Sequence, residues 1–176
     1  MRVTVLASKV LLGVVVLTAM PWTFNAAQLR DAYANWPPGG TPTLSSCFAT
    51  WDVAHYLCLS QSGYQVDSPS CAFYPLWPAA IRAGTVLTGG RPVLAAMLLC
   101  NACSLLGFWM FYRLVARHCG AEISRDALIL MLAFPGALFF SFPYSESLFF
   151  VLVMLFFWGL ELARWRWVAV ADSCCH

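Results

Sequence analysis

Charged side chains are scarce in this sequence. The 176 residues include 10 Lys and Arg and 8 Asp and Glu, or 10% of the chain, whereas soluble domains carry about 25%. Hydrophobic residues make up 61%, and the mean hydropathy is +0.72. This composition argues against a water-soluble globular domain and excludes intrinsic disorder. The net charge of only +2 does not indicate a nucleic-acid partner.

Several motifs that would indicate other functions are also missing. The sequence shows no internal repeat, no low-complexity stretch and no glycine-rich loop for a nucleotide. Eight cysteines are too few for a disulfide scaffold. Cys100 and Cys103 form a C-x-x-C pattern without a second pair, so we interpret them as packing residues rather than zinc ligands. We therefore expect neither a metal nor a cofactor.

Long apolar stretches dominate what is present. A transmembrane helix needs about 20 mostly apolar residues, and we predict an all-α integral membrane protein with about four such helices. The predicted segments are a first helix at 1–22, an outer loop at 23–91, a second helix at 92–116, a cytosolic loop at 117–126, a hairpin of the third and fourth helices at 127–163 and a cytosolic tail at 164–176. The hairpin is expected to turn at Pro143 to Ser145.

The distribution of basic residues predicts the orientation, because cytosolic loops are enriched in Lys and Arg. With the N-terminus in the cytosol, three basic residues lie outside, namely Arg30, Arg82 and Arg91. The seven on the cytosolic side are Arg2, Lys9, Arg113, Arg117, Arg125, Arg164 and Arg166. The basic start and apolar stretch of the first segment also fit a cleaved signal peptide. Either interpretation places loop 23–91 outside the cytosol.

One part of this outer loop carries residues that could support chemistry. Residues 50–60 predict a short amphipathic helix, with Thr50 as its N-cap and Gly63 as its C-cap. The residues expected on one face, at i, i+3, i+4 and i+7, are Asp52, His55, Tyr56 and Leu59. An acid and a histidine presented together form a candidate acid–base site. The alternative is that Asp52 caps the helix and His55 packs.

A proline-rich aromatic segment, Phe73–Pro78, follows in the same loop. It is either an interfacial anchor or the wall of a lipid-binding groove with Arg82 or Arg91 near a phosphate, which arginine binds through several hydrogen bonds at once. Glu146, at the outer end of the fourth predicted helix, is either a functional charge at the membrane or a first-turn acid that favours the helix dipole. The predicted topology puts Glu146 and Asp52 on the same side, so they can meet.

Several motifs occur here in an order that resembles one family. They are Trp51-Asp52-x-x-His55-Tyr56-Leu57, Gly63-Tyr64, Phe73-Tyr74-Pro75-Leu76-x-Pro78, Ala133-Phe134-Pro135-Gly136-Ala137 and Pro143-Tyr144-Ser145-Glu146-Ser147-Leu148-Phe149. The sequence from about Thr50 to Trp167 resembles the GPI mannosyltransferase of the second mannosylation step (PIG-V-like) and its prokaryotic relatives. Each motif alone is weak, and their combination is fairly specific.

This resemblance implies a GT-C-type multi-span glycosyltransferase in the endoplasmic reticulum membrane, or in the plasma membrane of a prokaryote. The donor would be a polyprenyl or dolichyl phosphate mannose, and the acceptor a glycolipid such as a GPI precursor. The expected catalytic residues are Asp52, as general base, and Glu146. The expected substrate-binding residues are His55, Tyr56, Arg82 and Tyr144.

The sequence departs from this family in stopping after four predicted helices, where relatives continue into further spans. We therefore interpret it as an N-terminal fragment, a truncated gene model or a splice form, which can lack activity by itself. The main alternative is a non-catalytic membrane subunit that binds a partner transferase. A small transporter is a third hypothesis, but spans two to four carry no charge at mid-span.

Overall fold

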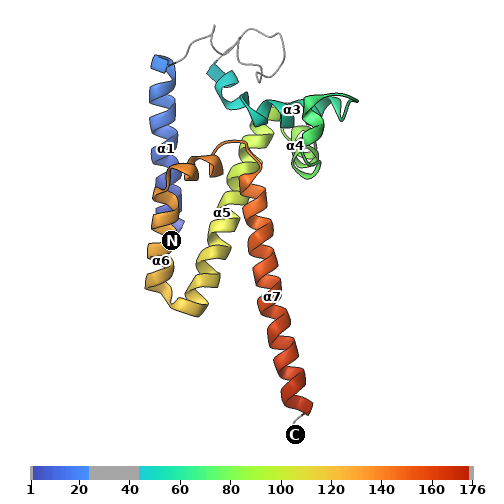
Figure 1. The fold of residues 1–176 in the computed structure, drawn as a ribbon. Coiled ribbons are helices and arrows are strands. Elements are labelled where there is room, and N and C mark those ends of the chain that lie inside the picture. The colour runs from blue at the N-terminus through green and yellow to red at the C-terminus, as the bar shows by residue number, and fades with distance from the viewer. Residues whose placement is uncertain (1, 24–43, 175–176) are drawn as a thin grey trace.

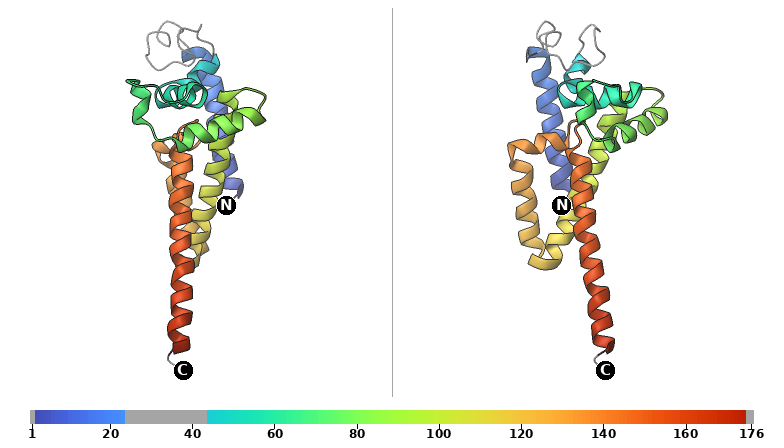
Figure 2. Two further views of the ribbon diagram at one scale, coloured as in Figure 1. Left: turned by 90° about the vertical axis from the view of Figure 1, so that its right-hand side faces the viewer. Right: turned by 45° about the vertical axis from the view of Figure 1, so that its right-hand side comes forward.

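The computed structural model describes residues 2–23 and 44–174, and every element in these ranges is helical. Four longer helices run alongside one another (Figure 1): α1 (Arg2–Thr23), α5 (Pro92–Cys119), α6 (Ala121–Ala133) and α7 (Glu146–Cys174). Shorter helices gather at one end: η1 (Leu44–Ala49), α3 (Asp52–Ser62), η2 (Pro69–Ala72) and α4 (Leu76–Leu87). The helix η3 (Pro135–Phe140) joins α6 to α7. Two further views show that α7 extends beyond the other helices at the far end (Figure 2).

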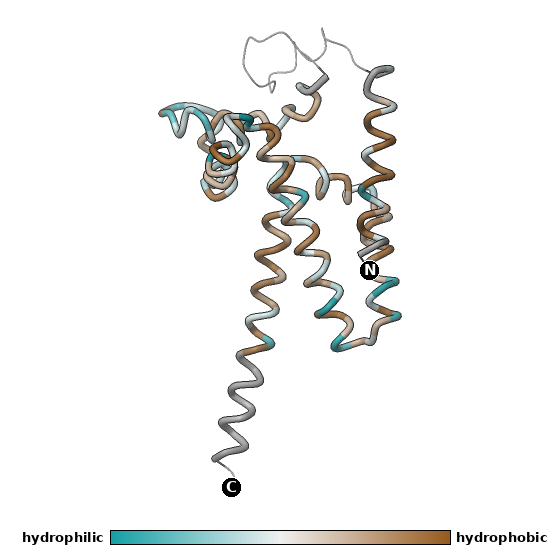
Figure 3. The backbone as a smooth tube through the Cα atoms, turned by 180° about the vertical axis from the view of Figure 1, so that it is seen from behind, coloured by the Kyte–Doolittle hydropathy of each residue, from teal (hydrophilic) through white to brown (hydrophobic). Residues whose placement is uncertain are grey.

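The predicted all-α class is confirmed for the described part of the chain. Within that part, α5 is the one helix long and apolar enough to cross a membrane on its own, and Thr4–Ala19 is a shorter apolar stretch. Hydrophilic residues gather among the short helices and at the turn between α5 and α6, with mostly apolar helix between them (Figure 3). The long helices therefore present an apolar band with a polar region at each end.

The prediction of a loop at 117–126 is wrong, because these residues are almost entirely helical. Helix α5 continues to Cys119 and α6 begins at Ala121, so Gly120 alone separates them. Gly120 has φ of 88°, a conformation that glycine adopts without steric cost, and the chain reverses there. The charges that suggested a loop lie on the ends of helices instead. Arg117 lies in the last turn of α5, where its positive charge interacts favourably with the negative end of the helix dipole.

The third helix is shorter than predicted. Helix α6 ends at Ala133 because Phe134 is extended, with ψ of 133°, and Pro135 follows. Its 13 residues measure about 20 Å, less than the roughly 30 Å of a hydrocarbon core. A turn around Pro143 leads into α7, as predicted. Helix α7 then continues to Cys174, so most of the predicted tail at 164–176 is helical.

Two clusters of buried side chains hold these helices together. At the end with the short helices, the cluster consists of Ala49, Val53, Tyr56, Leu57, Trp77, Ile81, Ala96 and Cys100. It packs α3 and α4 against the start of α5. Between the long helices, the second cluster consists of Val5, Phe108, Met110, Leu128, Phe150 and Met154. Val5 is 2% exposed there, so α1 packs against the other long helices.

Lys9 does not lie at the cytosolic end as the charge count assumed. Its ammonium donates to Asn101, nine residues into α5 from the end that carries the short helices, and to Ser141 in the turn before α7. Arg30 lies outside the described residues. Without Lys9 the sequence count becomes six basic residues against three.

Candidate active site

Asp52 is the first residue of α3, and an unusual backbone conformation places it there. The preceding Trp51 has φ of 55° and ψ of −133°, a strained conformation for a bulky side chain. Thr50 is not the N-cap that we predicted, since its hydroxyl donates to the carbonyl of Cys47 at 3.3 Å. The exposed carboxylate of Asp52 therefore stands at the positive end of the α3 dipole.

His55 lies one turn further along α3, and two contacts fix its ring. Nδ1 is 2.9 Å from the hydroxyl of Ser70, which is in η2. The imidazole also stacks on Phe73 with ring centroids 5.0 Å apart. These contacts orient the other ring nitrogen. Sequence patterns did not identify Ser70, because a serine 15 residues further along the chain shows no helical spacing to His55.

Tyr56 connects α3 to the turn before α7. Its hydroxyl is 2.9 Å from Oγ of Ser145, 89 residues later in the chain. The ring of Tyr56 meets Phe73 edge to face at 5.1 Å, and only 8% of the residue is exposed. Burial raises the pKa of Tyr56, and the charges of Asp52 and Glu146 raise it further. Tyr56 is therefore a neutral hydrogen-bonding group beside both carboxylates.

The turn before α7 is also held from α4. The indole nitrogen of Trp77 donates to the carbonyl oxygen of Pro143 at 3.2 Å. Both residues are buried, with Trp77 3% exposed. Ser147 is fully buried, and its hydroxyl donates to the carbonyl of Phe140 at 3.3 Å. Hydrogen bonds at Pro143 and at Ser147 thus hold the chain before and after Glu146. Glu146 is the first residue of α7.

Glu146 and Asp52 share one electrostatic environment. The Glu146 side chain reaches the surface, yet the protein around its carboxyl removes enough water to raise its pKa, and the negative charge of Asp52 raises it further. Tyr144 is affected in the same way: burial raises its pKa first, then the charges of Asp52 and Glu146. The charges of Asp52 and Glu146 therefore both act on Tyr56 and Tyr144, and the Tyr56–Ser145 hydrogen bond is the contact that links α3 to the turn before Glu146.

Arg82 does not join this group. Its guanidinium donates to the carbonyl oxygens of Ser60 and Gln61, at 3.3 and 3.4 Å. These carbonyls belong to the last turn of α3, where a cation favours the negative end of the dipole. Ser60 is eight residues from Asp52, or about 12 Å along the helix axis. The structure thus shows Arg82 tying α4 to α3, and Arg91 is exposed at the start of α5.

An apolar cavity of about 300 Å³ opens at the hydrogen-bonded pair Tyr56 and Ser145, both of which line it. The aromatic segment that we predicted as an anchor or a groove wall lines it, together with the first two turns of α7. The lining residues are Tyr56, Ala72, Phe73, Tyr74, Leu76, Trp77, Ser145, Leu148, Phe149 and Leu152. Ordinary ligand pockets have volumes of about 300–1,000 Å³, so this cavity can hold part of a lipid chain next to a polar reacting group.

The polar groups of the candidate site are two carboxylates (Asp52 and Glu146), one imidazole (His55) and two phenols (Tyr56 and Tyr144). Among the described residues, no group of three His, Cys, Asp or Glu side chains lies close enough to hold a metal ion. The arrangement offers proton acceptors and hydrogen-bond donors around one polar site at the edge of an apolar cavity. That combination suits general acid–base chemistry on a hydroxyl group of an amphiphilic substrate.

Comparison with known proteins agrees with the resemblance that the motifs indicated. No curated protein and no solved structure matches the chain. The family described as Mannosyltransferase (PIG-V) matches residues 41–172, well over half of the sequence. This range includes α3, the aromatic cavity wall and the turn with Glu146. The protein therefore belongs to the Mannosyltransferase (PIG-V) family.

Proposed function

We propose that this chain transfers mannose from a polyprenyl or dolichyl phosphate mannose to a glycolipid acceptor such as a GPI precursor. The family membership supports mannosyl transfer in general. The observation that carries the finer proposal is the 2.9 Å hydrogen bond from Tyr56, one turn after Asp52, to Ser145, the neighbour of Glu146. Tyr56 and Ser145 both line an apolar cavity. A lipid-linked donor needs such a cavity for its chain and polar groups for its sugar.

In the proposed reaction an acceptor hydroxyl attacks the anomeric carbon of mannose. The new carbon–oxygen bond forms as the bond from that carbon to the phosphate oxygen breaks, and the lipid phosphate leaves with the electron pair. Asp52 takes the proton of the hydroxyl as general base. Glu146, whose pKa is raised, retains its proton more readily, so it suits hydrogen bonding to a sugar oxygen. His55 and Tyr56 orient the substrate.

The proposed setting is a GT-C-type arrangement with the site at the outer or lumenal face of the membrane. The apolar band of the long helices and the polar regions at both ends support it (Figure 3). α5 would cross the membrane toward the cytosol, and the short helices would lie at the outer surface. In a eukaryote this is the endoplasmic reticulum membrane, and in a prokaryote the plasma membrane.

The test compares two aspartate variants of the full chain in a transfer assay with a mannose-labelled lipid phosphate donor. Asp52→Asn should lower the rate at least about a hundredfold, because general base catalysis contributes about 10²–10⁴. Asp126→Asn is the matched control, since Asp126 is exposed on α6 and pairs with the adjacent Arg125 at 3.1 Å. Near-normal transfer by Asp52→Asn would remove Asp52 as the base, whereas no transfer by the unaltered full chain would favour a non-catalytic subunit.

A further inference from the structure

Lys9 is a cation in the middle of an apolar helix, and the mechanism above does not use it. Its ammonium donates to Oδ1 of Asn101 at 3.0 Å, to the carbonyl of Phe140 at 2.9 Å and to Oγ of Ser141 at 3.2 Å. All three acceptors are neutral. Among the described residues Lys9 forms no ion pair with an acid. Dipoles alone therefore offset its positive charge in apolar surroundings, which is costly.

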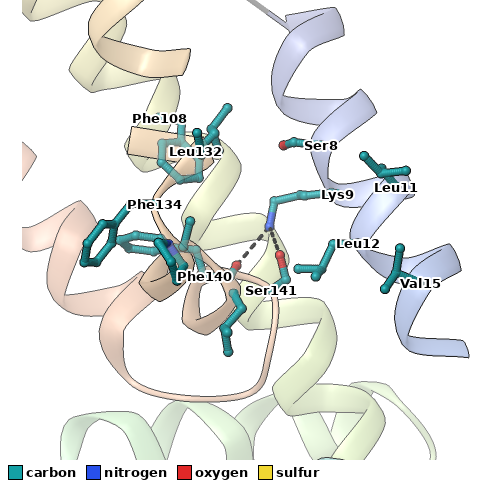
Figure 4. A pocket seen from close by; sticks show the side chains of 14 residues that line it. Ser8, Lys9, Leu11, Leu12, Val15, Phe108, Leu132, Phe134, Phe140 and Ser141 are labelled. Carbon is teal, nitrogen blue, oxygen red and sulfur yellow. Dashed lines mark hydrogen bonds between the residues drawn. The ribbon is translucent and has the colours of Figure 1, made fainter. Parts of the chain in front are cut away.

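Two cavities meet at this lysine. The larger, of about 400 Å³, lies between α1, α6 and η3, and the smaller, of about 220 Å³, lies between α1 and α5. Lys9, Leu12 and Ser141 line both. Figure 4 shows the ammonium pointing from α1 toward Phe140 and Ser141, with apolar side chains around the cavity. Neither cavity shares a lining residue with the one at Tyr56 and Ser145.

We propose that the cavity between α1, α6 and η3 binds an anionic lipid, with its phosphate at Lys9 and Ser141 and its aliphatic chain against Leu11, Leu12 and Val15. The three ammonium hydrogens of Lys9 are all donated to neutral acceptors, so a phosphate oxygen would replace one of these acceptors. The exchange is favourable because the charge of the phosphate complements that of Lys9 and an ammonium–phosphate bond is stronger than one to a neutral acceptor. Ser141 accepts from Lys9 and keeps its own hydrogen for a phosphate oxygen. The site is separate from the proposed mannose-transfer site and does not depend on it.

Binding to the full chain in a neutral detergent tests the proposal, with hexadecyl phosphate as the probe. Hexadecanol supplies the chain without the phosphate, and inorganic phosphate supplies the anion without the chain. Hexadecyl phosphate should bind and raise the temperature of thermal unfolding, as any ligand of the folded state does. Neither partial probe should do so at the same concentration. Equal effects of hexadecanol or of inorganic phosphate would overturn the proposal.

Variants then test the residues. Lys9→Met keeps the length of the side chain and should weaken hexadecyl phosphate binding about ten- to hundredfold, as loss of a charge-assisted bond does, whereas Lys9→Arg should retain binding. Leu12→Trp should weaken binding by filling the cavity.

Arg113→Met is the matched control, because Arg113 is exposed and lies over Trp109 on the same helix. Unchanged binding by a folded Lys9→Met would show Lys9 to be only a tether between helices. If Lys9→Met does not fold, the three probes on the unaltered chain decide.

Discussion

At the scale of single residues, the central feature is a pair of carboxylates with different surroundings. Asp52 is exposed at the N-terminus of α3, while Glu146 is partly desolvated at the start of α7. Pairs of this kind divide acid and base roles at one pH. The sequence identified both residues from motifs, but it did not show that Tyr56 and Ser145 hold the two helices together.

The pKa of Glu146 should respond to Asp52. The charge of Asp52 disfavours ionisation of Glu146, so Asp52→Asn should lower that pKa. The pKa should stay above the usual range of glutamate, because burial is the larger cause and remains. Carbon NMR on glutamate-labelled protein measures it. The three signals, from Glu122, Glu146 and Glu161, can be assigned with Glu146→Gln.

The control for this titration is Asp126→Asn, which should leave the pKa of Glu146 unchanged. Asp126 is on α6 next to Arg125, and its charge does not contribute to the pKa of Glu146. An unshifted Glu146 signal in Asp52→Asn would mean that the two carboxylates do not share one site.

Sequence reasoning was less successful with the basic residues. Arg82 was expected at a phosphate, but it binds carbonyl oxygens of α3. Linear spacing does not show which helix end a side chain from the next helix will reach. Lys9 was assigned to the cytosol because it lies near the N-terminus. A lysine within an apolar stretch is itself a signal of a buried polar contact, and that signal was available.

At the scale of helices, the packing depends on an aromatic side chain that lies against the backbone of a glycine. α5 and α7 cross at Gly107, where an added Cβ would lie 2.5 Å from Cδ1 of Phe150. Glycine is thus required by contact rather than by backbone conformation. The sequence predicted helices from their apolar character, but such patterns do not report crossing points. They also missed that Gly120 can end one helix and start another.

Gly107→Ala should therefore destabilise the protein by about 1–3 kcal/mol through overpacking. Gly159→Ala in α7 is the matched control, because no atom lies within 4 Å of its added Cβ. That change should be neutral or should stabilise by up to about 1 kcal/mol, since alanine favours a helix. Unfolding in mixed micelles with increasing SDS measures both. Equal effects of the two variants would contradict the tight crossing.

At the scale of the whole molecule, the two polar regions lie at opposite ends of the long helices: the short helices at one end and the turn at Gly120 at the other. α5 runs from the short helices to the turn at Gly120, and α6 returns toward the turn before α7 (Figure 1). This places residues 44–91 and Glu146 at the same end of the molecule. The order of apolar stretches allowed this antiparallel arrangement to be predicted. The length of α6 could not be predicted in the same way, because the apolar run continues through Phe140 although the helix ends at Ala133.

Labelling of single cysteines should show opposite sides for the two ends. Cys71, in η2, and Cys119, at the end of α5, are both exposed, so each can be kept alone in a variant with the other cysteines replaced. An impermeant maleimide should label Cys71 on the outer side of the membrane and Cys119 on the cytosolic side. Cys58 is half-buried and is a poorer probe. Labelling of both from one side would contradict the proposed membrane orientation.

The most direct test of the central proposal is a double-mutant cycle on the rate of mannose transfer. Asp52→Asn, Glu146→Gln and the double variant are compared with the unaltered chain under the same conditions. If the carboxylates act as one site, the double variant should be no slower than the slower single variant, because residues that act as a unit are strongly non-additive. Losses that multiply, or a normal rate in either single variant, would contradict the shared catalytic site.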